Sequence, residues 1–108
     1  MAADNTDETG GRQLPTIDRL VHEPARLMIL AHLYVVESAD FVFIMRQTEL
    51  TQGNLSSHMN KLEAAGYIEV TKGFKGKRPH TMLRLTDSGR AAFDAYRQQM
   101  QKVLSQTH

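Results

Sequence analysis

The chain has 108 residues, of which 41% are hydrophobic, and it contains no cysteine. This length fits one domain with a small core, and the missing thiols exclude disulfide bridges and thiolate chemistry. No apolar run approaches the roughly 20 residues of a membrane helix, so we expect a cytoplasmic protein without a membrane anchor. The formal net charge is only +1, but residues 71–84 carry five basic side chains and no acid. That segment is a candidate for contact with a polyanion, and a solvated basic loop is the alternative.

The chain begins with a polar, acidic segment, residues 1–13, without periodic apolar residues. Such a segment buries too little apolar surface to order itself, so we expect a disordered tail followed by one domain over residues 14–106. Apolar residues recur at helical spacing over 14–21 and predict a short first helix. Pro24 suits the first turn of a new helix and separates the two.

Residues 24–36 predict a second helix that is apolar on nearly every side. A helix of this kind is buried on every side. A single small layer cannot cover it, so we expect its own core to take one face and a partner subunit to take part of the other. The pattern therefore predicts a homodimer, for which two-fold symmetry is the usual arrangement.

The middle of the chain has the pattern of two helices joined by a turn. After a break with capping residues, the expected elements are a short helix over about 40–47, a polar turn over 48–51 and a helix from 51 to about 65. In the second helix of this pair Leu55, Met59 and Leu62 form a stripe that faces the core. Gly66 ends this helix and places Tyr67 where a Schellman motif makes its hydrophobic contact with Leu62.

Two runs that follow predict a β-hairpin, because apolar and polar residues alternate over 67–71 and again over 81–85. Residues 73–79 between them hold two glycines, a proline and three cations, so we expect a long basic loop at the tip. Thr86 then caps a last helix with one apolar face. The members of that face are Phe93, Tyr96, Met100, Val103 and Leu104. The predicted fold class is mainly α with a small β-hairpin.

Two helices, a four-residue turn and a hairpin are the elements of a winged helix-turn-helix. The second helix of the pair enters the major groove of DNA, so it needs an apolar face for docking and a short polar face for the bases. Residues 52–65 have both faces, although a merely solvated polar face is the alternative. The polar side chains that suit base edges or phosphates are Gln52, Asn54, Ser56, Ser57, Asn60 and Lys61. The phosphate-binding candidates of the hairpin are Lys72, Lys75, Lys77 and Arg78.

Three segments also resemble a known group of regulators. The run LSSHMNKLEAAGY, residues 55–67, is similar to the recognition-helix signature of the MarR and ArsR superfamily, as is LTDSGR, residues 85–90, after the hairpin. The run KGKRPHT, residues 75–81, resembles the wing of a compact MarR-like subgroup. The resemblance covers about residues 14–104. It implies a dimeric repressor or activator whose first and last helices form the dimer interface, with DNA contacts from the helix and wing residues named above.

The chain departs from these families in two ways. The longer MarR proteins carry an acidic-arginine wing pattern and longer helices around a phenolic-ligand pocket, and the sequence leaves open whether a small-molecule effector binds here. ArsR-type metal sensors use cysteines or paired histidines and aspartates, and here the five histidines show no i, i+4 pairing. We therefore expect no metal site and no cofactor. No nucleophile elbow or phosphate loop is present, so we expect no enzyme.

The sequence thus predicts a sequence-specific DNA-binding regulator of transcription, with repression favoured, that binds a palindromic operator as a homodimer. The alternatives are a winged-helix module that binds protein and a winged helix that binds RNA. The polar helix face with Lys61 and the basic hairpin favour duplex DNA.

Overall fold

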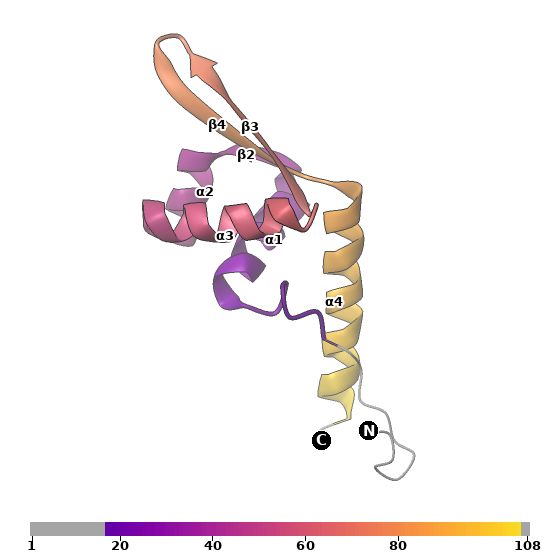
Figure 1. Ribbon diagram of the computed structural model, residues 1–108. Coiled ribbons are helices and arrows are strands. Elements are labelled where there is room, and N and C mark those ends of the chain that lie inside the picture. The colour runs from indigo at the N-terminus through magenta and orange to yellow at the C-terminus, as the bar shows by residue number, and fades with distance from the viewer. Residues whose placement is uncertain (1–16, 107–108) are drawn as a thin grey trace, which may run out of the picture.

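The computed structural model describes residues 17–106, and the predicted tail at 1–13 lies outside them. In chain order the elements are α1 (Pro24–Val36), β2 (Ser38–Asp40), α2 (Phe41–Thr48), α3 (Gln52–Ala64), β3 (Ile68–Lys75), β4 (Arg78–Leu85) and α4 (Asp87–Ser105). The strands form one antiparallel sheet in the order β2-β4-β3. Figure 1 shows α1, α2 and α3 gathered below the sheet, the β3-β4 hairpin projecting beyond them and α4 extending away from the body on the other side. Among the residues described, no helix is both long and apolar enough to cross a membrane.

α1 is the central helix of the core. Ile29, Leu30 and Leu33 are fully buried, and the helix contacts α2, α3, α4 and β4. At its N-terminus Glu23 is extended, as a residue before proline must be, and accepts a hydrogen bond from the backbone N–H of Arg26 at 2.8 Å. The prediction that the protein's own core covers one face of this helix is confirmed. The opposite face stays open at its C-terminal end, where Val35 is 82% exposed.

Residues 17–23 form no helix, so the predicted first helix is wrong over this part, and its start at 14–16 lies outside the described residues. Asp18 forms a turn instead. Its Oδ1 accepts hydrogen bonds from the backbone N–H groups of Leu20 and Val21 at 3.0 and 3.3 Å. A short carboxylate side chain that binds nearby N–H groups competes with the helix in this way.

Side-chain hydrogen bonds hold this turn against two distant elements. The hydroxyl of Tyr67, which precedes β3, donates to Asp18 Oδ2 at 2.9 Å, and His22 Nδ1 lies 2.8 Å from the hydroxyl of Tyr96 in α4.

Burial raises the pKa of Tyr67 above its ordinary value of 10.0, and the hydrogen bond to Asp18 and the carboxylate charge raise this pKa further. The phenol therefore stays protonated. Its contribution to stability is complete below pH 10 and is lost as the pH rises through the raised pKa.

The expected break at 37–40 contains a short strand. Glu37 turns the chain with a positive φ of 73°, and Ser38, Ala39 and Asp40 then pair with the end of β4. The carbonyl of Glu37 also accepts from the backbone N–H of Leu85 at 2.9 Å. This pairing satisfies backbone groups on the outer edge of β4, which no local pattern in residues 37–40 could predict. Asp40 then caps α2 by accepting from the backbone N–H of Phe43 at 2.7 Å.

Both ends of α3 are as predicted. The Thr51 hydroxyl accepts from the backbone N–H of Asn54 at 3.1 Å at the N-terminus. At the C-terminus Gly66 has a φ of +80°, its N–H donates to the Glu63 carbonyl at 2.9 Å, and the N–H of Tyr67 donates to the Leu62 carbonyl at 3.0 Å. These two bonds define the Schellman motif.

The expected long loop over 73–79 is wrong. The strands continue to the pair Lys75–Arg78, so the turn consists of Gly76 and Lys77 alone. Gly76 has a φ of +67°, and a positive φ at the first central residue only is the pattern of a type II′ turn, which matches the twist of a hairpin. Pro79 fits inside the strand because β2 pairs only with residues 82–84, so that edge of β4 needs no N–H donor at Pro79.

Thr86 and Gly89 join α4 to the end of α3. The Thr86 hydroxyl donates to the Gly66 carbonyl at 2.6 Å and accepts from the Gly89 N–H at 2.9 Å. Gly89 packs so closely that a Cβ there would overlap with the carbonyl oxygen of Tyr67. Only glycine permits this approach of two backbone segments.

We predict that Gly89→Ala lowers the free energy of unfolding by about 2–3 kcal/mol, because backbone must move to admit the methyl group. Gly53→Ala is the matched control, since no atom lies within 4 Å of a Cβ at that helical position. It should raise stability by about 0.5–1 kcal/mol. Urea denaturation measures both variants. Equal stability of the two would contradict the close packing at Gly89.

Candidate nucleic-acid interface

α3 presents one apolar and one polar side. Leu55, Met59 and Leu62 are buried against the core. Of the six α3 residues that the sequence predicted for DNA contact, five are exposed, namely Gln52, Asn54, Ser57, Asn60 and Lys61. Ser56 is only half-buried, so it lies at the edge of the exposed face. Gly53 is exposed with open space around it, so another molecule can approach the backbone of the first turn.

Arg26 and His58 hold α3 against the start of α1. Arg26 donates through Nε to the carbonyl of Leu20 at 2.6 Å, and its Nη1 lies 3.1 Å from His58 Nδ1. Because a guanidinium can only donate, Nδ1 of His58 is the acceptor. Glu23 Oε1 lies 3.9 Å from the same nitrogen. His58 therefore holds α3 in place from the side that faces the protein. No cluster of three or more possible metal ligands occurs within residues 17–106.

The hairpin places its predicted cations in solvent. Lys72, Lys75, Lys77 and Arg78 are all exposed, and Lys75 and Arg78 are partners in the pair that closes the turn. The other basic residue of this segment, Arg84, is engaged by Glu69 at 3.0 Å. The tip therefore concentrates positive charge, whereas the base of the hairpin is neutralised.

The hairpin and the N-terminal end of α3 border the same depression. A cavity of about 210 Å³ is lined by Asp40, Phe41, Val42, Gln52, Pro79, His80 and Thr81. His80 Nε2 lies 3.6 Å from Asp40 Oδ2, so the hairpin is held near the N-terminus of α2. This juxtaposition brings the first turn of α3 and the wing onto one continuous surface. The sequence did not predict that His80 would hold the hairpin to the start of α2, because the contact spans 40 positions of the chain.

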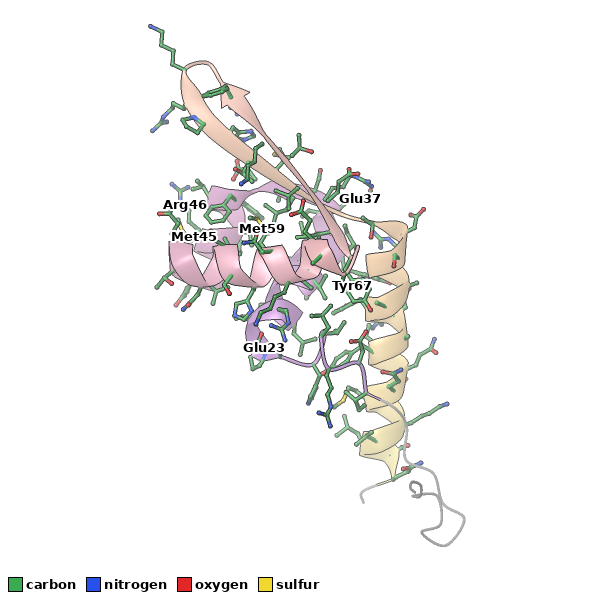
Figure 2. The ribbon with its side chains drawn as sticks, viewed as in Figure 1. Glu23, Glu37, Met45, Arg46, Met59 and Tyr67 are labelled. Carbon is green, nitrogen blue, oxygen red and sulfur yellow. The ribbon has the colours of Figure 1, made fainter. Side chains whose placement is uncertain are left out.

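Arg46 is a further cation that the sequence analysis did not single out. It is exposed in the last turn of α2, and Figure 2 places it beside the N-terminal end of α3. The first helix of a helix-turn-helix crosses the DNA backbone, so a cation here suits a phosphate. Arg46 is the only charged residue of α2, and this feature of the sequence could have identified it as a candidate for phosphate contact.

The fold and this surface define a winged helix-turn-helix protein. The chain belongs to the winged helix DNA-binding domain family, whose model matches residues 25–104. It is 36% identical over 78 residues to an uncharacterized protein of Methanocaldococcus jannaschii, covering 72% of this chain and 85% of the relative.

Two solved structures are also similar. A transcriptional regulator homologue of Pyrococcus horikoshii is 30% identical and superposes with a TM-score of 0.76. The superposition covers 82% of this chain and 87% of the Pyrococcus chain. A MarR-family transcriptional regulator of Silicibacter pomeroyi shares 21% identity and a TM-score of 0.58, covering 83% of this chain and 62% of its own. The predicted fold class, a mainly α winged helix with a small β-hairpin, is thereby confirmed.

We predict that replacing Lys75, Lys77 and Arg78 by alanine lowers affinity for all duplex DNA alike. Each lost phosphate contact should flatten the plot of log affinity against log salt by about 0.9, because fewer counterions are released. Titrations of a fluorescent duplex at several salt concentrations measure this slope. A slope equal to that of the wild-type protein would show that the wing does not touch DNA.

Proposed function

We propose that this protein is a sequence-specific regulator of transcription that binds duplex DNA as a homodimer, with α3 in the major groove and the β3-β4 hairpin at the neighbouring phosphates. One observation carries the proposal. The buried side of α3 docks on the core, and its exposed side bears short polar residues on a surface shared with the basic hairpin, which has no acid between residues 70 and 86. An ordinary solvated helix more often carries pairs of Glu and Lys. Membership in a DNA-binding family supports the same function.

The first turn of α3 is the proposed reader of sequence. Gln52 and Asn54 stand at the N-terminal end, which reaches deepest into the groove. Their amides can pair with the N6 and N7 edge of adenine. Ser57 and Asn60 follow on the exposed face, and Lys61 lies where it suits a phosphate.

We predict that Asn54→Ala and Gln52→Ala lose preference for the specific site and largely keep nonspecific binding. Each lost pair should cost roughly 1–3 kcal/mol of discrimination. The specific site is first selected from a random duplex library with the wild-type protein, and DNA upstream of the gene is tested beside it. Gel shifts then compare selected and scrambled duplexes, with Lys75→Ala as the control that weakens both. If the two helix variants weaken both duplexes equally, α3 positions the protein without reading bases.

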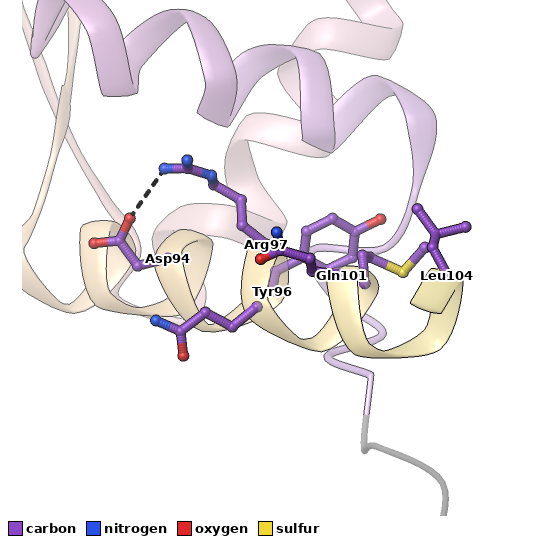
Figure 3. Close-up of a pocket in the computed structure, with 7 residues that line it drawn as sticks. Asp94, Tyr96, Arg97, Gln101 and Leu104 are labelled. Carbon is purple, nitrogen blue, oxygen red and sulfur yellow. Dashed lines mark ion pairs between the residues drawn. The ribbon is translucent and has the colours of Figure 1, made fainter. Parts of the chain in front are cut away.

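α4 is the proposed dimer element. It extends away from the body, and along its C-terminal half a groove of about 590 Å³ is lined by Asp94, Tyr96, Arg97, Gln98, Met100, Gln101 and Leu104 (Figure 3). Leu104 is 66% exposed, although it belongs to the predicted apolar face of this helix. A second copy packed here would bury that face. A two-fold dimer implies a roughly palindromic site with half-sites about 34 Å apart, and repression remains the proposed direction of regulation.

We predict that Leu104→Glu converts a dimer into a monomer at micromolar concentration, because a buried unpaired charge opposes association. Sedimentation equilibrium measures the mass. Val35→Glu tests the exposed apolar end of α1, the other surface for which the sequence predicted a partner subunit, and should remain dimeric if the α4 groove forms the interface. A monomeric wild-type protein would refute the proposed dimer. If Val35→Glu dissociates and Leu104→Glu does not, the dimer interface lies on α1 and not on α4.

A further inference from the structure

Phe74 is an exposed aromatic residue at a basic tip. Its side chain is 75% exposed, and it lies between Lys72 and Lys75 in β3. The other large exposed hydrophobic residues lie on the helices α1, α2 and α4. No packing within the described chain explains an aromatic ring at this place.

The strand register gives the tip two different faces. Phe74 is the partner of Pro79, and the next pair toward the tip, Lys75 with Arg78, points to the opposite face because side chains alternate along a strand. In a two-residue hairpin the closing pair is hydrogen-bonded, so the Phe74–Pro79 pair is of the other kind, in which facing side chains are closest. The tip therefore carries an apolar pair on one face and a cationic pair on the other.

The tip is also narrow and accessible. The turn consists of Gly76 and Lys77 alone, so the hairpin ends without a bulky loop. Gly73 and Gly76 flank Phe74, and no atom lies within 4 Å of a Cβ at either position, so a nucleic-acid backbone can approach closely. The two-residue turn leaves little freedom to lose on binding.

We propose that Phe74, supported by Pro79, is an apolar wedge that enters the DNA minor groove and partly unstacks one base step. This rests on the proposed binding of duplex DNA. The charge of the hairpin identifies DNA as the partner. Residues 70–86 contain no acid, and the exposed cations Lys75, Lys77 and Arg78 lie at the tip beside the wedge, where they can bind phosphates. Apolar wedges of Phe and Pro between base steps are a known means of kinking a duplex.

The wedge has a consequence for sequence preference. Unstacking is easiest at pyrimidine–purine steps such as TA and hardest in stiff A-tracts. The wing would therefore add preference for a TA step beside the site that α3 reads. This preference would come from the deformability of the DNA and needs no hydrogen bond between the wing and the bases.

The test uses the whole protein and two duplexes of equal length, alternating d(TA) and d(A)·d(T), each with one 2-aminopurine that brightens on unstacking. The wild-type protein should bind the alternating duplex about tenfold more tightly and raise its fluorescence. Phe74→Ala should bring the affinity ratio near one and abolish the fluorescence change, with an unchanged salt slope because no charge is lost. Phe74→Leu should keep most of the effect.

Lys75→Ala is the matched control. It should weaken both duplexes, flatten the salt slope and leave the affinity ratio and fluorescence change intact. Because the Phe74 ring is largely exposed, its removal should leave the thermal midpoint nearly unchanged. Equal ratios and fluorescence for wild type and Phe74→Ala overturn the wedge alone. Failure of the wild-type protein to bind either duplex overturns the proposed function and the wedge with it.

Discussion

The packing of α3 on the core is the interaction on which the rest of this structure depends. Leu55, Met59 and Leu62 are buried, and burying each such side chain contributes roughly 1.5–3 kcal/mol. The same packing decides which residues face outward, because a helix with its apolar stripe fixed has only one exposed side. Stability and recognition therefore share one cause. The Arg26–His58 contact and the Schellman motif at Gly66 then limit how far the helix can rotate or slide.

The wing is positioned by tertiary contacts at its base. β2 pairs with the lower part of β4, and His80 approaches Asp40 at the start of α2. These contacts leave the tip free while they orient the hairpin relative to α3. The distribution of charge follows the same division, since Arg84 is paired with Glu69 at the base and the cations near the tip are exposed. The hairpin therefore has a base that is fixed to the core and a tip that carries exposed positive charge, which suits contact with a polyanion such as the DNA backbone.

The single chain leaves apolar surface that its own core does not cover. The open end of α1 meets α2 in a shallow cavity of about 240 Å³ lined by Ala31, His32, Val35, Val36 and Phe43. The groove along α4 is the larger of the two. A small domain buries a limited share of its surface, so its apolar residues are not all accommodated in one layer. The long last helix is the more favourable place for association, because its apolar face continues past the end of the globular body (Figure 1).

The sequence by itself determined the elements whose signals are local. Thr51, Gly66 and Thr86 lie within one turn of the groups they cap, and the period of Leu55, Met59 and Leu62 identified the buried side of α3. The tertiary structure decided the features that depend on distant partners. The strand at 38–40 exists because β4 offers a free edge, and the turn at 18–21 persists because Tyr67 binds Asp18. The predicted loop at 73–79 shortened to two residues because cross-strand pairing outweighed the glycines and the proline within it. Local periodicity carries no information on such pairing, since its free energy comes from residues many positions away.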